Sequence, residues 1–190
     1  MKGQLRAMHV RSINVGLPRA VEWHGEYVTT AIFKSPVPGP VAVRTTNLDG
    51  DGQADLTVHG GARKAVYVYP HEHYAWWRGE LPHADLGFGA FGENLTTERV
   101  LESAVSPGDT LEIGTAIFQV TVPRMPCYKL GIRFDRADMV KRFWRSARCG
   151  FYLSVARERK IAAGDEIRLT PGPERGPTIA DLFALRGAKS

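Results

Sequence analysis

The chain has 190 residues, of which 43% are hydrophobic and 24% charged, a composition that excludes disordered and fibrous proteins. Its formal charge of +5 is spread over 25 basic and 20 acidic residues, so an anionic small molecule fits it at least as well as nucleic acid, and no nucleic-acid-binding motif is recognisable. No apolar run reaches the roughly 18 residues of a membrane span, and the first residues lack the pattern of a secretory signal. We therefore expect a globular, cytoplasmic protein that engages neither membrane nor nucleic acid.

Short runs of β-branched and aromatic residues, separated by turn residues, predict a mainly β chain. In chain order, the expected strands are 10–15, 21–33 folded over a turn at His24-Gly25, 41–45, 65–69, 110–113, 116–122, 151–157 and 166–170. Two of them follow Gly-Asp turns, and we expect the carboxylates of Asp109 and Asp165 to face solvent. So many strands indicate a closed or partly open β-barrel, because closure removes unpaired strand edges.

A few helices are expected around the barrel. The first runs from Pro70 to about Arg78, and the second from Asp135, as its N-cap, to about Ala147. The second helix presents a core-facing stripe at helical spacing, formed by Met139, Val140, Phe143 and Trp144. A short terminal helix beginning at Thr178 is expected to pack four side chains against the barrel: Ile179, Leu182, Phe183 and Leu185. The length favours one domain, residues 1–190.

The clearest candidate for chemistry is the segment 122–130, VPRMPCYKL in one-letter code. Its two prolines cannot continue a ladder inside a sheet, so the backbone must leave the strand and present Cys127 from a stiff loop. Arg124 and Lys129 flank the thiol, and nearby positive charge favours the thiolate that binds soft metals or carries a persulfide. An inert buried cysteine is the alternative. We adopt that interpretation for Cys149, the second of the two cysteines.

Two further segments offer polar groups to a ligand. The pair Gly60-Gly61, between His59 and Lys64, would let backbone amides approach an anion closely. Glu93-Asn94 follows a glycine and would match the donors and acceptors of a fused heterocycle. Taken singly, ordinary turns and a structural histidine explain both segments as well.

Two other patterns are assigned no function. His71 and His73 are two residues apart on an expected helix, a spacing at which the side chains do not face one metal ion. The G-x-G-x-x-G string at 87–92 neither follows a convincing strand nor opens a helix, so it is not a dinucleotide-binding motif. The nearby aromatic residues are interpreted as packing: Tyr74, Trp76 and Trp77.

Taken in order, four segments resemble the MOSC family, named for the C-terminal domain of molybdenum cofactor sulfurase. They are VHGGARKA at 58–65, FGENLT at 91–96, PRMPCYKL at 123–130 and RCGFYLSV at 148–155. The likeness spans roughly residues 40 to 170. It is close to the bacterial branch whose members reduce N-hydroxylated bases. It implies a β-barrel similar to that of pyruvate kinase, with peripheral helices. The Pro/Gly-rich connector and the short terminal helix, residues 171–190, follow this core.

The resemblance also implies a cofactor and its ligands. Cys127 would ligate the metal of the molybdenum cofactor (Mo-molybdopterin) or carry sulfur. The implied cofactor-binding residues are Lys64, Arg124 and Arg148 near the pterin phosphate, Lys129 beside the thiol, and His59, Gly60, Gly61, Glu93 and Asn94 along the pterin pocket. At the level of the family there is also an association with pyridoxal phosphate binding.

On this resemblance we expect an oxidoreductase component that removes oxygen from N-hydroxylated small molecules. Two cysteines cannot hold a four-thiolate iron–sulfur cluster, so electrons would come from an external flavin or iron–sulfur protein. One alternative is a carrier that holds a persulfide on Cys127 or transfers the cofactor. Another is a non-catalytic domain whose basic face meets nucleic acid.

Overall fold

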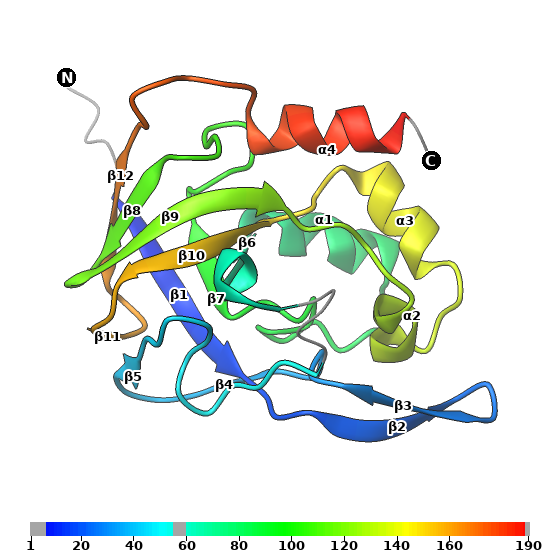
Figure 1. Ribbon diagram of the computed structural model, residues 1–190. Coiled ribbons are helices and arrows are strands. Elements are labelled where there is room, and N and C mark those ends of the chain that lie inside the picture. The colour runs from blue at the N-terminus through cyan, green and yellow to red at the C-terminus, as the bar shows by residue number, and fades with distance from the viewer. Residues whose placement is uncertain (1–6, 55–59, 189–190) are drawn as a thin grey trace.

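The computed structural model describes residues 7–54 and 60–188 (Figure 1). The described strands are β1 (Met8–Val15), β2 (Arg19–Trp23), β3 (Glu26–Thr30), β4 (Ser35–Pro36), β5 (Val41–Ala42), β6 (Val66–Pro70), β7 (Leu95–Glu98), β8 (Thr110–Ile113), β9 (Ala116–Pro123), β10 (Phe151–Arg157), β11 (Lys160–Ile161) and β12 (Glu166–Thr170). The helices are η1 (Ala62–Lys64), a 3-10 turn, α1 (Glu72–Glu80), α2 (Lys129–Phe134), α3 (Met139–Ser146) and α4 (Ile179–Gly187).

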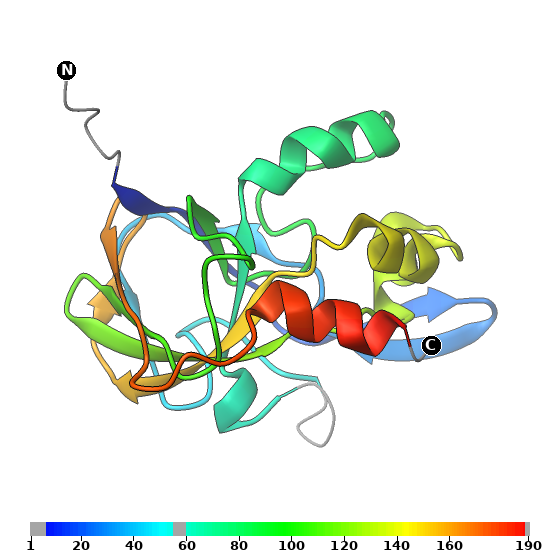
Figure 2. The same ribbon diagram turned by 90° about the horizontal axis from the view of Figure 1, so that it is seen from above.

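Seven of the described strands close into a barrel, in the order β12–β8–β9–β10–β6–β7–β1 (Figures 1 and 2). The barrel closes where β1 pairs with β12, with Met8 opposite Ile167. Neighbouring barrel strands are antiparallel except for the parallel pair β6–β7. An irregularity between Val10 and Ser12 bends β1, whose far end pairs with β4 outside the barrel. The predicted mainly β closed barrel is confirmed.

Both Gly-Asp turns are present, but one carboxylate is not where we expected it. Gly108 and Gly164 have φ values of 95° and 94°, as the turns require. Asp109, however, is only 2% exposed, so the prediction that it faces solvent was wrong. Its Oδ2 accepts from the amide of Ser106 at 2.8 Å and its Oδ1 from the amide of Gly172 at 2.8 Å. This carboxylate therefore joins the turn before β8 to the connection after β12.

An aromatic cluster fills the space between β6 and the helices α1 and α3. Tyr69 of β6 stacks on Phe91 with ring centroids 4.6 Å apart, and Trp77 of α1 stacks on Phe143 of α3 at 6.1 Å. Trp77 Nε1 donates to the Tyr69 hydroxyl at 2.6 Å, which satisfies the buried indole. Both Trp77 and Tyr74 are fully buried, so their interpretation as packing residues is confirmed.

The helices lie toward one side of the barrel (Figures 1 and 2), with boundaries that differ from the predicted ones. Asp135 is not an N-cap: it ends the unpredicted helix α2 in a left-handed conformation, with φ of 49° and ψ of 47°. Asp and Asn adopt this conformation more readily than most residues, so the same side chain suits both helix ends. Helix α3 then starts at Met139, after Asp138.

Two further helix boundaries depend on tertiary packing. Pro70 remains in β6, where it lies opposite Thr97, so α1 starts two residues later than predicted. Helix α4 begins as predicted, with Thr178 and Asp181 forming a capping box. Its Leu185 is 60% exposed, which corrects the expectation that it packs against the barrel. No helix in the described ranges is long and apolar enough to cross a membrane.

Candidate functional site

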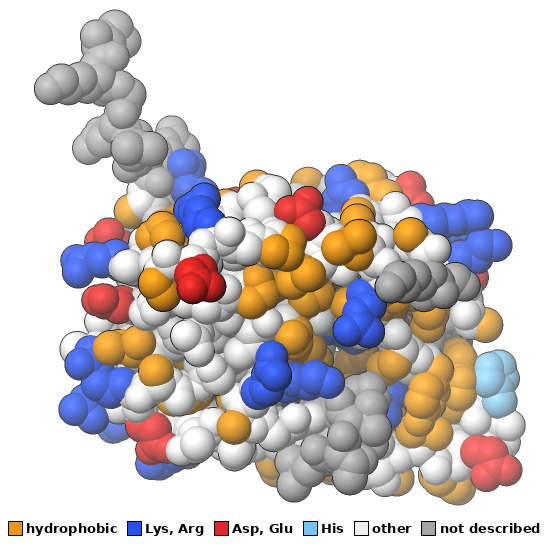
Figure 3. All heavy atoms as spheres, turned by 45° about the horizontal axis from the view of Figure 1, so that its top comes forward, with side chains coloured by type: hydrophobic (Ala, Val, Ile, Leu, Met, Phe, Trp, Pro, Cys, Tyr) orange, Lys and Arg blue, Asp and Glu red, His pale blue; other side chains and the backbone are white. Residues whose placement is uncertain are grey.

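A cavity opens beside the barrel where β3, β6 and the loop after β9 meet. Segments from 30–34, 51–54, 64–67, 91–94 and 124–129 contribute lining residues, together with Tyr152 of β10. Its volume is about 100 Å³, several times the space that one water molecule needs. On the face shown in Figure 3, Lys and Arg side chains flank a hollow in the surface.

The loop between β9 and α2 carries Cys127 to this cavity. Strand β9 ends at Pro123, opposite Phe151 of β10, and the Arg124 amide makes one more bond across, to the Gly150 carbonyl at 3.3 Å. The chain then leaves the sheet, and the thiol of Cys127 is partly exposed and lines the cavity. The proline-flanked bend predicted from the sequence is therefore present in the fold.

Arg124 is the buried cation of that loop. It is 5% exposed, and its guanidinium lies over the rings of Phe143 at 4.9 Å and Tyr67 at 5.5 Å. Its charge is close enough to Cys127 for an electrostatic interaction. Its Nη1 has no hydrogen-bond partner among the residues that the structure describes. Leaving a buried donor unpaired costs about 1–3 kcal/mol, so this atom calls for an acceptor from a ligand or water.

Two lysines complete the cationic lining near the thiol. Lys64 is the last residue of η1, which begins directly after Gly61. The Nζ of Lys64 is 6.0 Å from the ring centroid of Tyr152. Lys129 opens α2, two residues after Cys127. Both line the cavity with Arg124, so three of the four predicted cations come together there.

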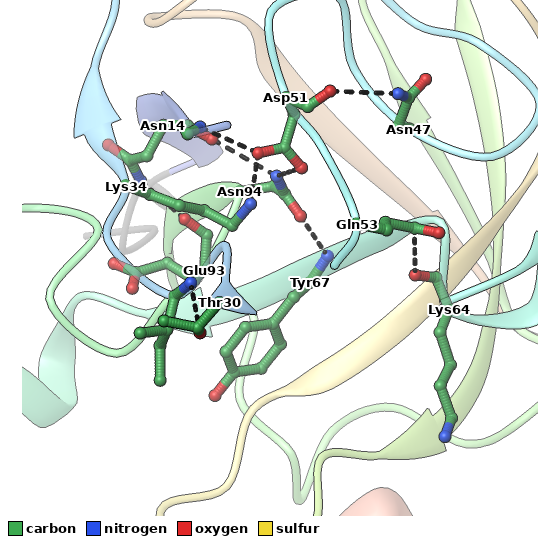
Figure 4. A network of polar contacts seen from close by, with 12 residues as sticks. Asn14, Thr30, Lys34, Asn47, Asp51, Gln53, Lys64, Tyr67, Glu93 and Asn94 are labelled. Atoms are coloured by element: carbon green, nitrogen blue, oxygen red, sulfur yellow. Dashed lines mark hydrogen bonds and ion pairs between the residues drawn. The ribbon is translucent and has the colours of Figure 1, made fainter. Parts of the chain in front are cut away.

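A buried network centred on Asp51 forms another wall of the cavity (Figure 4). Asp51 Oδ1 accepts from the Gly16 amide at 2.9 Å and forms an ion pair with Lys34, while Oδ2 accepts from Asn94 Nδ2 at 2.8 Å. Asn94 Oδ1 in turn accepts from the Tyr67 amide at 3.0 Å. Sequence analysis missed both Lys34 and Asp51. The only signal was a lysine directly after the apolar run Ala31-Ile32-Phe33.

Glu93 points away from the cavity, although Asn94 lines it. The buried carboxylate of Glu93 accepts from the amides of Gly89 at 2.9 Å and Phe91 at 3.1 Å, and from the hydroxyls of Thr96 and Tyr74. Burial raises its pKa, although these hydrogen bonds oppose the shift. The structure therefore places Glu93 as the anchor of its own turn, with its acceptors already used.

The glycine pair does not line the cavity either. Gly61 has φ of 86°, and its amide donates to Gln53 Oε1 at 3.0 Å, so that amide is already engaged. Gln53 itself lines the cavity. Gly60 is described but is not among the lining residues. His59 lies outside the described residues.

Arg148 lies in a different hollow from Cys127. Its guanidinium is 4.3 Å from the ring centroid of Trp76, and its Nη1 donates to the Ser146 carbonyl at 2.7 Å. The hollow is shared with His73 and Glu102, whose side chains pair at 2.8 Å. The resemblance placed Arg148 near the pterin phosphate, but the structure does not bring it to the cavity that holds the thiol.

No group of three or more metal-ligating side chains occurs in the described part of the chain. A metal bound in this cavity would therefore take Cys127 as its protein ligand, and a cofactor or solvent would supply its other ligands.

Comparison with known proteins identifies the family. The model of the MOSC domain matches residues 55–168, which lie within the span predicted from the four motifs. The chain belongs to the MOSC domain family. A relative from Bacillus subtilis, the uncharacterised protein YflK, is 40% identical over 177 residues, covering 93% of this chain and 79% of the relative. The crystal structure of YiiM from Geobacillus stearothermophilus superposes with a TM-score of 0.76 at 34% identity, covering 96% of this chain and 85% of that one.

A protein of Gibberella moniliformis named "Reductase" is similar to this chain over part of its length. It is 38% identical over 152 residues, which are 78% of this chain but 27% of the fungal protein. The similarity to YiiM and YflK agrees with the bacterial branch predicted from the motifs.

Proposed function

We propose that this MOSC protein binds the molybdenum cofactor through Cys127 and reduces N-hydroxylated compounds with electrons from another protein. One observation supports the proposal most: a partly exposed thiol and a buried guanidinium with an unpaired Nη1 share one cavity. A soft sulfur ligand beside an anion-binding donor suits a metal held by a phosphate-bearing heterocycle.

The lining residues fit that cofactor. Arg124, Lys64 and Lys129 would hold its anionic groups, because guanidinium and ammonium groups supply charge-assisted hydrogen bonds to phosphate. Asn94 and the Asp51 network would fix the opposite wall. Glu93 and Arg148 are left out of this assignment because neither lines the cavity.

When bound, the cofactor supplies the two-electron chemistry that side chains cannot perform. The chain's own residues orient the ligand and substrate and restrict water. We infer that a flavin or iron–sulfur protein supplies the electrons, because the two cysteines of this sequence cannot hold a four-thiolate iron–sulfur cluster. Unpaired thiols also suit the reducing cytoplasm, where we place the protein.

The relative named "Reductase" supports the reaction class, and the MOSC resemblance supports the substrate class.

The test is metal analysis of protein made in a host that synthesises the cofactor. We expect about one molybdenum per chain in the wild type and none in Cys127→Ser. Cys149→Ser is the matched control and should keep its molybdenum, because Cys149 is buried away from the cavity. Molybdenum retained by Cys127→Ser would contradict the assignment of the ligand.

Turnover separates the reductase from the carrier. The loaded wild type should reduce a hydroxylamine compound with an artificial electron donor such as reduced methyl viologen. A persulfide on Cys127, detected by mass spectrometry without turnover, would instead indicate sulfur transfer.

A further inference from the structure

Lys34 is a buried cation of the cavity for which the proposed function gives no role. Its side chain is 8% exposed and lines the same cavity as Cys127. An ammonium group has three N–H donors. Among the described residues, Asp51 accepts one of them, and no other acceptor is seen for Lys34. The remaining donors are left for a molecule bound in the cavity.

The Asp51 network fixes the position of this ammonium. Both carboxylate oxygens of Asp51 have further partners, the Gly16 amide and Asn94 Nδ2. Asn94 is held in turn by the Tyr67 amide of β6, so the pair is tied to the barrel (Figure 4). A lysine fixed in this way faces the cavity at small entropic cost when a ligand arrives.

The surroundings make Lys34 a better acid than a surface lysine. Burial lowers its pKa, and the negative charges of Asp51 and Glu93 oppose this only in part. The other ionisable side chains that line the cavity are those of Lys64, Arg124, Lys129, Cys127, Tyr67 and Tyr152. Burial is therefore the effect that favours release of a proton from Lys34.

We propose that Lys34 is the acid that protonates the departing oxygen when an N-hydroxylated compound is reduced in this cavity. The inference rests on the proposed function. Reduction of R–NH–OH to R–NH₂ and water consumes two electrons and two protons. The N–O bond breaks, and the oxygen takes a proton from Lys34 and leaves as water. The nitrogen receives the two electrons, supplied by the donor protein, and the second proton, supplied by solvent. Solvent then reprotonates Lys34.

The other lining groups suit this step less well. Burial raises the pKa of both Tyr67 and Tyr152, which makes their hydroxyls weaker acids. Arg124 cannot release a proton at any ordinary pH. Lys34 is held by a carboxylate, lines the cavity, and has a pKa lowered by burial.

The test compares Lys34→Arg with wild type, both loaded with cofactor. Arginine keeps the charge and the ion pair with Asp51 but cannot donate its proton. We expect unchanged molybdenum content and a kcat lower by about 100-fold or more. The wild-type kcat should fall as pH rises through the pKa of Lys34, since the protonated form is active, and this limb should be absent in the variant. Lys141→Arg, an exposed change on α3, is the control and should behave as wild type.

A Lys34→Arg protein that turns over at the wild-type rate with the wild-type alkaline limb would overturn the role of Lys34. The proposed function would still stand. A wild type without molybdenum or without turnover would overturn the proposed function itself. Loss of molybdenum from Lys34→Arg would show that Lys34 holds the cofactor, and would overturn its assignment as the acid.

A measurement on the unmutated protein guards against a variant that fails to fold. In protein labelled with ¹³C at lysine Cε, NMR titration of the loaded form should show Lys34 losing its proton at lower pH than the exposed lysines. This midpoint should coincide with the alkaline limb of kcat. A Lys34 midpoint equal to those of the exposed lysines, or a limb at a different pH, would contradict the proposal.

Discussion

The two cysteines lie at the same end of the β9–β10 strand pair, in connections joined by the hydrogen bond from the Arg124 amide to the Gly150 carbonyl. The connection after β9 leaves the sheet, and Cys127 lines the cavity there. The connection before β10 turns inward, and Cys149 is fully buried. Burial, followed by the nearby charge of Glu102, raises the pKa of the Cys149 thiol far above its usual range. Neighbouring positions in a fold can therefore leave one thiol accessible and the other enclosed.

The inward connection is held by two contacts that the outward one lacks. Gly150 has φ of 63°, and a Cβ there would lie 2.3 Å from the Val68 carbonyl oxygen. The Gly150 amide also donates to Glu102 Oε1 at 2.6 Å, and Glu102 pairs with His73. The backbone next to Cys149 is therefore packed directly against β6.

The contrast between the thiols should be largest in their reactivity. In cofactor-free protein at neutral pH, we expect iodoacetamide to alkylate Cys127 at least about 1,000-fold faster than Cys149, because Cys149 must await an opening of the fold. Peptide mass spectrometry over a time course measures both rates. Similar rates would mean that the Cys149 connection opens readily and that the comparison is false.

Disrupting the close packing of Gly150 against β6 should have the next largest effect. Gly150→Ala must strain a positive φ and displace the Val68 carbonyl, so we expect the free energy of unfolding to fall by about 3 kcal/mol or more. Denaturant titration measures it. Gly176→Ala is the control, since a Cβ there meets nothing within 4 Å, and it should change stability by less than about 0.5 kcal/mol. Equal stabilities for both variants would contradict the tight packing inferred for this connection.

The smallest effect concerns the His73–Glu102 pair that supports Gly150. Burial raises the pKa of Glu102, but the hydrogen bonds from His73 and Gly150 outweigh it, so the pKa lies below its ordinary 4.5. The pair therefore stabilises the fold above about pH 4.5, and this stabilisation is lost as pH falls through the folded-state pKa.

His73→Leu tests this pair. It should cost about 1.5 kcal/mol at pH 7. The cost should stay near that value down to about pH 4.5 and shrink below it, as urea unfolding at each pH would measure. The exposed His83→Leu should show no such pH dependence. A cost for His73→Leu that stays constant from pH 7 to acid would show that His73 acts through packing alone.

Local patterns in the sequence determined much of this protein. Strands 110–113, 151–157 and 166–170 were predicted to the residue, because alternation and turn glycines act over a few positions. The same holds for the start of α4 at its capping box and for the proline-flanked loop of Cys127. The four motifs also indicated the MOSC family, whose model matches the chain.

What only the tertiary structure decided is where polar side chains point. Lys34, Asp51 and Asn94 come from three separate connections and meet only once the barrel closes. Glu93 and Arg148 belong to matching motifs, yet one anchors its own turn and the other occupies a second hollow. Local sequence limits the backbone at each residue, whereas the direction of a side chain depends on long-range strand pairing and on the buried partners that satisfy it.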